Sequence, residues 1–127
     1  MVYRLSGGKI GGNMSGVHIL LLESVGRKTG KTRTTPLVYI RDGENYVVTA
    51  SNGGEPHHPG WYYNLHSQPQ IVIQVMDQHI SVETEQADPE ERRRLRAELV
   101  KTNPRFDKYQ RKTAREIAMF ILHPNGK

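Results

Sequence analysis

The stretch "TTPLVYIRDGENYVVTAS", Thr34 to Ser51, decides the fold because it contains a complete β-hairpin. β-Branched and aromatic residues fill both of its halves, which is the composition of β-strands. Between the halves, "DGEN" (Asp42–Asn45) supplies the acidic and glycine residues that favour a tight turn. The stretch therefore predicts one strand over Arg33–Arg41 and the next over Tyr46–Ser51.

Four more segments have the composition or the period-two alternation of strands. In one of them Ile80, Val82 and Thr84 alternate with polar residues, as in a half-exposed strand. Helices are expected in "PGWYYNLHSQ", in "DPEERRRLRAELVKTN", where Asp88 and Glu91 form a capping box, and in "RFDKYQRKTAR". The further strands are expected at Val17–Val25, Gln70–Met76, His79–Ala87 and Glu116–Leu122.

This order of elements predicts an α+β fold, a small six-stranded antiparallel β-barrel with two to three flanking helices packed outside. The length of 127 residues fits one domain, which we place at residues 17–124. The glycine-rich N-terminal sequence "MVYRLSGGKIGGNMSG" predicts a flexible arm over residues 1–16.

The composition restricts the classes of function. Eighteen Lys and Arg against 13 Asp and Glu give a net charge of +5, which favours anionic partners. The absence of cysteine excludes disulfides, thiolate nucleophiles and thiolate metal sites. No apolar run approaches the roughly 20 residues that span a bilayer, and no signal peptide is evident, so a cytoplasmic location is expected.

The stretch "GRKTGKTR", Gly26 to Arg33, joins the first two expected strands and contains four cations and no acid. Its arginines and lysines could form charge-assisted hydrogen bonds to a phosphate, and its glycines permit positive backbone dihedrals that let amide groups converge on an anion. A soluble hairpin turn explains the same composition, and charge alone leaves both interpretations open. A Walker loop is rejected, because its first glycine position is occupied by Val25.

The segment "ASNGGEPHHPGWYYNL", Ala50 to Leu65, combines two glycines with aromatic residues. Gly53 and Gly54 would let the backbone approach a flat ligand, and Trp61 offers either planar ligand contact or core packing, of which packing is favoured. The adjacent His57 and His58 point to opposite sides of an extended chain and make a poor bidentate site, so no metal is expected.

In the segment "NPRFDKYQRKTAREI", Phe106 and Tyr109 are spaced to share one helix face. Tyr109 could present its hydroxyl to a cleft, or the pair could simply pack the helix on the barrel. The arginines Arg92–Arg94 and Arg96 are interpreted as a solvated helix face, offset by nearby glutamates. No G-x-S-x-G motif is present, so a nucleophile elbow is not indicated.

Taken together, "GRKTGKTRTTPLVYIRDGENYVVTASNGGEPHHPGWYYNL" is similar to the deazaflavin-dependent nitroreductase family. These actinobacterial proteins bind the deazaflavin coenzyme F420 on a split β-barrel. Each motif is weak alone, but their ordered set is specific: G-R-K-[ST]-G, P-L, R-D-G, S-N-G-G, H-P-x-W-Y-x-N-L and finally Tyr109-Gln110-Arg111. The resemblance extends from about Leu20 to Pro124, most of the chain.

The resemblance implies an oxidoreductase that transfers hydride from reduced F420 to a quinone, an activated enone or a nitro compound. By the match, Arg27, Lys28 and Arg33 would hold the phosphodiester and glutamate tail of the cofactor, while Lys31 is left to solvent. The "SNGG" turn and the strand before it would lie along the deazaflavin ring. Tyr109 is the candidate catalytic residue, able to orient the acceptor or deliver a proton. The implied cofactor-binding residues are Arg27, Lys28, Thr29, Arg33, Pro36, Ala50, Ser51, Asn52, Gly53, Gly54, Trp61 and Asn64.

Three alternatives stay open at this stage. The same barrel could bind FMN, haem or a lipid, or it could carry F420 without catalysis. Nucleic-acid binding is suggested by the sequence pI of about 9.6, but the basic residues are split between a turn and an acid-flanked helix, and no recognition motif appears. We therefore expect no nucleic-acid partner. A homodimer and a peripheral contact with the inner face of the cell membrane are left open.

Overall fold

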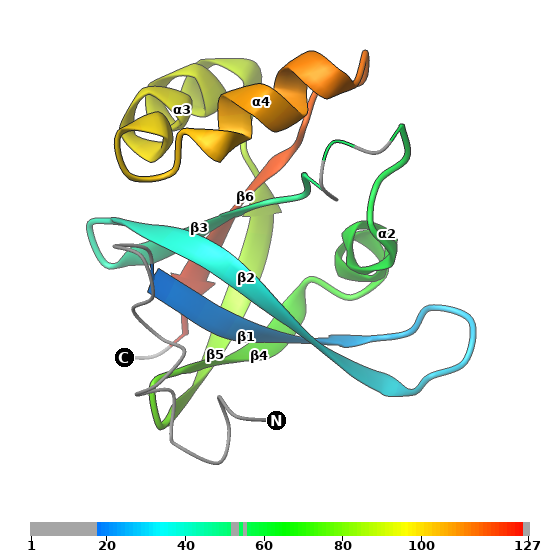
Figure 1. The fold of residues 1–127 in the computed structure, drawn as a ribbon. Coiled ribbons are helices and arrows are strands. Elements are labelled where there is room, and N and C mark those ends of the chain that lie inside the picture. The colour runs from blue at the N-terminus through cyan, green and yellow to red at the C-terminus, as the bar shows by residue number, and fades with distance from the viewer. Residues whose placement is uncertain (1–17, 52–53, 55, 126–127) are drawn as a thin grey trace.

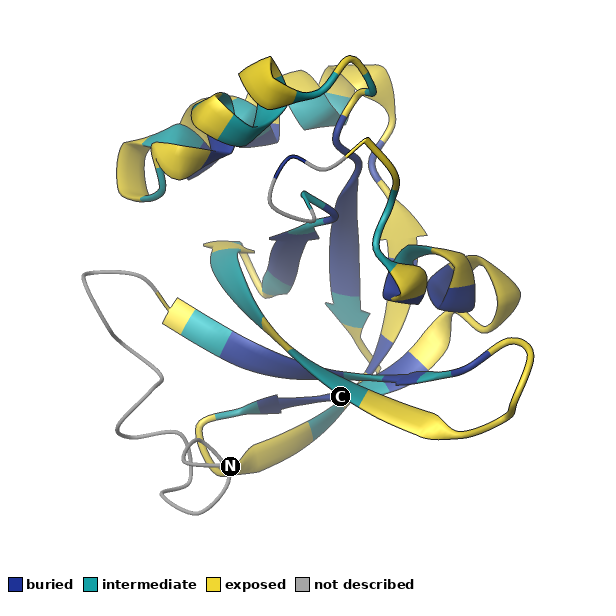
Figure 2. Cartoon of the chain, turned by 45° about the vertical axis from the view of Figure 1, so that its right-hand side comes forward, coloured by how far each residue is buried: buried dark blue, intermediate teal, exposed yellow. Residues whose placement is uncertain are grey.

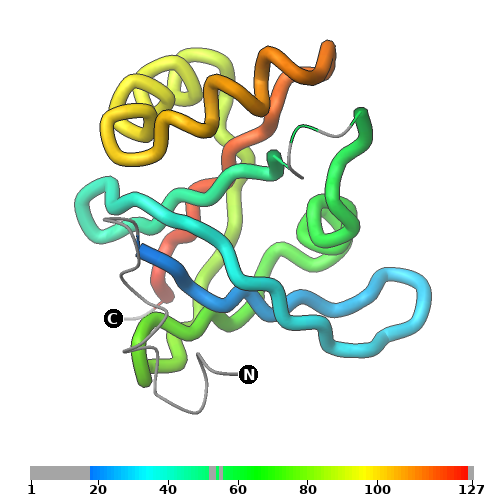
Figure 3. Tube along the Cα trace, viewed as in Figure 1, coloured from blue at the N-terminus to red at the C-terminus, as the bar shows by residue number. Residues whose placement is uncertain are grey.

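The computed structural model describes residues 18–51, 54 and 56–125. The expected flexible arm over residues 1–16 lies outside the described residues, and the domain boundaries at 17 and 124 stay predictions. Figure 1 shows a barrel of strands with helices α3 and α4 side by side over one flank and helix α2 apart from them, and Figure 3 shows the path of the chain in the same view.

The barrel is closed and antiparallel throughout, with strand order β1-β2-β3-β6-β5-β4. In the first hairpin Asp42 pairs with Asn45, and Gly43 takes the first central turn position with a φ of 63°, where glycine is favoured. The predicted six-stranded antiparallel barrel is confirmed. Its strands are β1 (His18–Val25), β2 (Thr32–Asp42), β3 (Asn45–Thr49), β4 (Gln70–Val75), β5 (Gln78–Gln86) and β6 (Met119–Pro124).

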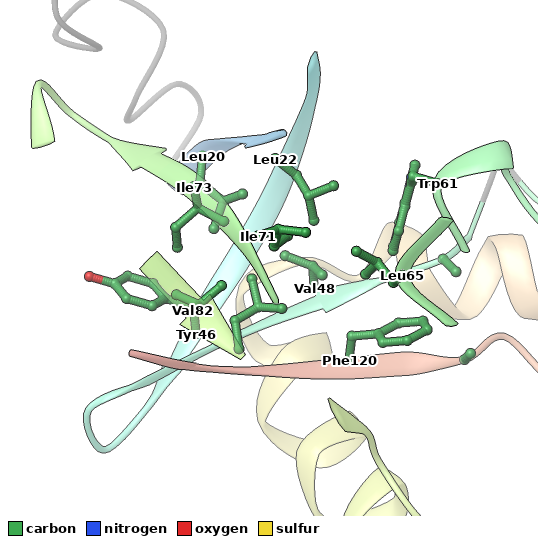
Figure 4. Close-up of a cluster of buried hydrophobic side chains, with 13 residues drawn as sticks. Leu20, Leu22, Tyr46, Val48, Trp61, Leu65, Ile71, Ile73, Val82 and Phe120 are labelled. Atoms are coloured by element: carbon green, nitrogen blue, oxygen red, sulfur yellow. The ribbon is translucent and has the colours of Figure 1, made fainter. Parts of the chain in front are cut away.

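Two apolar clusters result from the alternation of side chains along the strands. Val48 of β3 points into the barrel, where it belongs to a cluster with Leu22, Ile73 and Phe120 (Figure 4). The neighbouring Val47 belongs instead to an outer cluster, which we define as Val47, Ala87, Leu95, Leu99, Phe106, Ile117, Met119 and Ile121. The inner cluster stabilises the barrel, and the outer cluster fixes α3 and α4 on it.

Three helices flank the barrel: α2 (Gly60–Ser67), α3 (Pro89–Thr102) and α4 (Arg105–Lys112). Figure 2 shows that their buried residues face inward while most of their outer surface is exposed. The predicted capping box of α3 is present, since Glu91 N–H donates to Asp88 Oδ1 at 2.8 Å and Asp88 N–H donates to Glu91 Oε1 at 3.3 Å. In the part of the chain that the structure describes, no helix has the length and apolar character needed to cross a membrane.

The last strand begins at Met119, three residues later than the predicted Glu116. The backbone of Ile117 is bonded to helix side chains, because its N–H donates to Gln110 Oε1 at 3.0 Å and its carbonyl accepts from Arg92 Nε at 2.7 Å. A peptide group used in this way is not available to a strand ladder. The prediction was wrong here because side chains of α3 and α4 replace the neighbouring strand.

Three arginines of α3 form hydrogen bonds or ion pairs with residues outside this helix. Arg92 keeps only 11% of its side chain exposed, and Arg94 forms a two-point ion pair with Asp42 at 3.1 and 3.0 Å. Arg96 bonds to Asp107 of α4 at 2.6 Å. The interpretation as a solvated face was therefore wrong for Arg92, whereas Arg93 and Arg94 are exposed as expected.

Candidate functional site

The turn between β1 and β2 is held by its own backbone. Gly26 N–H donates to the carbonyl of Lys31 at 2.8 Å, and Gly30 N–H donates to the carbonyl of Gly26 at 2.8 Å. Gly30 has a φ of 73°, a backbone conformation that residues other than glycine adopt only at a cost in free energy. The backbone of the turn therefore has a defined conformation, and this conformation fixes where its cationic residues begin.

This turn and the start of α2 enclose a pocket of about 420 Å³, which we call the basic pocket. Its cations come from Arg27, Lys28 and Arg33, and no carboxylate is among the described residues that line it. Lys31, on the same turn, does not line it. The lining comprises Ser24, Gly26, Arg27, Lys28, Thr29, Arg33, Thr35, Gly60, Trp61 and Asn64.

A buried amide attaches the turn to α2. Asn64 is 5% exposed; its Oδ1 accepts from Arg27 N–H at 3.1 Å, and its Nδ2 donates to Ser24 Oγ at 3.2 Å. The Arg27 guanidinium lies over the ring of Tyr63, 4.8 Å from its centroid. These contacts place Arg27 at the pocket wall. Sequence reasoning missed Ser24, whose polar side chain at the end of an apolar strand was the available signal.

Trp61 belongs to the core and to the pocket wall. It is 6% exposed and packs edge-on against Phe120 at 5.7 Å, at the α2 end of the inner cluster (Figure 4). It also lines the basic pocket. Core packing, which was favoured from the sequence, and a place beside the candidate site are therefore both found.

A second cavity of about 580 Å³, which we call the cleft, lies between the barrel and the α3–α4 connection. It brings together Pro36 of β2, Ser51, which follows β3, and Tyr109 of α4. The cleft is continuous in sequence with the basic pocket along β2, because Thr35 lines the pocket and Pro36 lines the cleft. Its lining comprises Ile19, Pro36, Leu37, Val38, Thr49, Ser51, Thr102, Asn103, Pro104, Arg105 and Tyr109.

Of the four other residues predicted to bind the cofactor, the structure describes Ala50 and Gly54, and neither lines the basic pocket. Ala50 is fully buried and donates its N–H to the carbonyl of Ala118 at 2.9 Å, so it lines neither cavity. Gly54 has a φ of 80°, and a Cβ there would lie 2.9 Å from the carbonyl oxygen of Tyr109. Gly54 therefore permits close approach to α4. Asn52 and Gly53 lie outside the described residues.

The described histidines do not gather into a metal site: within residues 18–51, 54 and 56–125, no group of three or more metal-ligating side chains is suitably arranged. His58 stacks on Tyr62 with ring centroids 3.8 Å apart and an angle of 4° between planes. Burial, followed by the charge of Arg115, lowers the pKa of His58. This histidine is held neutral near neutral pH and participates in packing.

Comparison with known proteins gives consistent results over the whole barrel. A family model described as F420H(2)-dependent quinone reductase matches residues 1–124. An F420H(2)-dependent quinone reductase of Mycobacterium tuberculosis (strain ATCC 25618 / H37Rv) is 38% identical over 125 residues, 95% of this chain and 84% of the relative.

Two solved structures are each 34% identical to the chain. One is described as a domain-swapped dimer, with a TM-score of 0.76 and coverage of 88% of both chains. The other is described as an F420-H2 dependent reductase, with a TM-score of 0.75 and coverage of 83% of this chain and 93% of that one. Both structures therefore share the barrel and its order of elements with this chain.

Proposed function

The chain belongs to the F420H(2)-dependent quinone reductase family, and from this premise we propose that the basic pocket binds part of the cofactor and the cleft binds the acceptor. The basic pocket holds the anionic phosphate and glutamate tail of F420, and the cleft holds a quinone beside Tyr109. The predicted family, split-barrel fold, reductase activity and F420 cofactor agree with this membership.

The residues of the basic pocket fit the charge of this cofactor. The positive charges of Arg27, Lys28 and Arg33 attract the negative phosphate and carboxylates of the cofactor. No carboxylate among the described lining residues competes with the cofactor for these cations. Arginine forms two-point hydrogen bonds to such groups, and lysine contributes a point charge. The observation that supports the proposal best is this group of three cations, one of which, Arg33, lies on β2, the strand whose Pro36 lines the cleft beside Tyr109.

Bound F420H2 supplies a hydride to the acceptor, so the chain needs neither a nucleophile nor a metal of its own. Reduction of a quinone to a hydroquinone takes a hydride and a proton. Among the described residues of the cleft, Tyr109 is the one phenol, and its hydroxyl can orient the quinone oxygen and deliver a proton to it. Pro36, Leu37 and Val38 offer apolar surface to the quinone ring.

The role of the basic pocket is tested by Arg33→Ala. We expect the Kd for F420 to rise by about 10- to 150-fold, corresponding to the roughly 1.5–3 kcal/mol of a charged hydrogen bond. Fluorescence of the cofactor during titration with protein measures the Kd. Lys31→Ala is the matched control, because it removes the same charge from the same turn without altering the pocket wall. Equal Kd values for the two variants would show that the turn acts only through its overall charge.

The role of Tyr109 is tested by Tyr109→Phe, which removes the hydroxyl and keeps the ring. We expect kcat for quinone reduction to fall by about 10²- to 10⁴-fold, the usual contribution of a positioned proton donor, with the Kd for F420 unchanged. Oxidation of F420H2 by menadione, followed by absorbance, gives kcat. Unchanged turnover would restrict Tyr109 to packing against the outer cluster, where its ring also lies.

The family membership favours this function over an FMN-, haem- or lipid-binding barrel and over a carrier without catalysis. Nucleic-acid binding is less favoured, because Arg94 and Arg96 already form ion pairs with Asp42 and Asp107. Activated enones and nitro compounds stay predictions as acceptors, as does contact with the inner membrane face. A homodimer is also a prediction, supported by the neighbour described as a domain-swapped dimer.

A further inference from the structure

Arg115 connects three segments that are far apart in the sequence. Its Nη1 donates to the carbonyl of Ala50 at 3.0 Å, and its Nη2 donates to the carbonyl of Ser51 at 2.8 Å. Nη1 also lies 3.3 Å from Nδ1 of His58, just before α2. The guanidinium thus holds the chain where it leaves β3, using the fixed fork geometry that lysine lacks.

The contact with Arg115 fixes the protonation state of His58. A guanidinium has donors and no acceptor, so Nδ1 of His58 must accept, and the ring proton must sit on Nε2. The stacked ring of Tyr62 and the edge of Tyr63, with its centroid 6.0 Å away, hold the imidazole in this orientation. A neutral His58 can therefore accept a hydrogen bond from Arg115.

The same residue is tied to α4 through its backbone. Nε2 of Gln110 donates to the carbonyl of Arg115 at 2.7 Å, and Gln110 directly follows Tyr109. Oε1 of Gln110 accepts from Arg92 Nη2 at 2.7 Å, which links the arrangement to α3. Arg115 therefore joins the two walls of the cleft, the Ser51 wall and the Tyr109 wall.

We propose that Arg115 is a positioning residue for the acceptor: together with neutral His58 it fixes the Ala50–Ser51 backbone relative to Tyr109, and protonation of His58 loosens this wall. The inference rests on the proposed function, because it takes the cleft as the acceptor site. Arg115 does not line the cleft and acts through the backbone that does.

The surroundings of His58 give the direction of the pH effect. Among the described residues, the titratable or charged groups placed against it are Arg115, from the segment before β6, and Tyr62, Tyr63 and His66, from α2. Burial, Arg115 and His66 lower its pKa below 6.5, so His58 is neutral at pH 7. As the pH falls below 6.5, the unfolded chain binds this proton first, so the stabilisation is present above that pH and is lost progressively below it.

The test compares Arg115→Met and His58→Phe with Arg111→Met, an exposed control that loses the same charge from the end of α4. In cofactor-free protein at pH 7.5, we expect the Ala50 amide, bonded to Ala118, to exchange with deuterium about tenfold faster in Arg115→Met, with the control unchanged. With F420H2 and menadione, kcat/KM of Arg115→Met should fall by about 10- to 100-fold, because the Ser51 side of the cleft is displaced relative to Tyr109. Arg115→Lys, which keeps a donor for one carbonyl, should lie between.

The pH profile separates positioning from a purely structural role. In wild type we expect kcat/KM to fall as the pH drops below 6.5, and in His58→Phe, which keeps the stacking and cannot take a proton, this fall should disappear. The inference is overturned if Arg115→Met keeps wild-type exchange at Ala50 or wild-type kcat/KM, or if the acid fall persists in His58→Phe. It is also overturned if exchange rises evenly across the chain, since that indicates global destabilisation.

Failure of the proposed function gives a different result. If wild-type protein does not oxidise F420H2 with menadione, the quinone reductase proposal fails, and the positioning role fails with it. The exchange of Ala50 in the cofactor-free variants still decides whether Arg115 fixes the end of β3.

Discussion

Phe106→Ala is expected to lower the free energy of unfolding by about 3–5 kcal/mol, the range for removing a fully buried aromatic side chain. Phe106 is 1% exposed and packs in the outer cluster, where Leu95 and Leu99 of α3 are also buried. The guanidinium groups of Arg92 and Arg96 lie 5.9 and 5.7 Å from its ring centroid and lose this contact as well. Urea denaturation followed by circular dichroism measures the change.

Lys108→Ala is the matched control, because Lys108 is an exposed residue of the same helix. Its effect should stay within about 0.5 kcal/mol, as for most surface substitutions. A loss below about 1 kcal/mol for Phe106→Ala would contradict the view that this ring anchors α4, since even moderate core truncations exceed it. Because α4 carries Tyr109, a folded Phe106→Ala protein should also show reduced quinone turnover.

Gly54→Ala is expected to lower the free energy of unfolding by about 2–4 kcal/mol, from two additive causes. The φ of 80° is unfavourable for alanine, and the new Cβ would lie 2.9 Å from the Tyr109 carbonyl oxygen and 3.0 Å from Lys112 Cβ. The helix backbone cannot give way without moving α4 away from the barrel. Thermal and urea unfolding measure the loss.

Gly43→Ala isolates the first cause, the backbone strain. Gly43 has a φ of 63°, but no described atom lies within 4 Å of the place that a Cβ would take, so only strain of about 1–2 kcal/mol applies. The excess loss in Gly54→Ala reports the collision with α4. If both variants lose the same free energy, α4 is free to shift, and the approach of Gly54 to the helix is not a constraint.

Much of the fold could be predicted because its signals are local. The hairpin turn at Gly43, the alternation along β5 and the capping box at Asp88 are all determined by residues within a few positions of one another. The start of β6 could not be predicted in this way. It depends on Gln110 and Arg92, whose side chains replace a strand partner for Ile117 only after α3 and α4 have packed.

The candidate site likewise contains residues that local sequence could predict and residues that depend on long-range contacts. Arg27, Lys28 and Arg33 are adjacent on one turn, so their common location followed from the sequence once the turn was recognised. Ser24 and Arg115 act through partners 40 and 65 positions away, and these partners are brought to them only by the folded barrel. Gly54 shows the limit of composition, because glycine permits approach to a ligand or to a helix, and the structure places α4 there.

The insertion of β6 between β3 and β5 has a consequence for biosynthesis. Tyr46 pairs with Leu122, so the barrel closes only when residues 76 positions apart (122 − 46) meet. During translation both edges of the unfinished sheet stay open until β6 has left the ribosome, and open edges template aggregation. Closure is a long-range, late event that slows folding. Shortening the chain by this one strand would therefore affect solubility and yield before it affected any property of the two cavities.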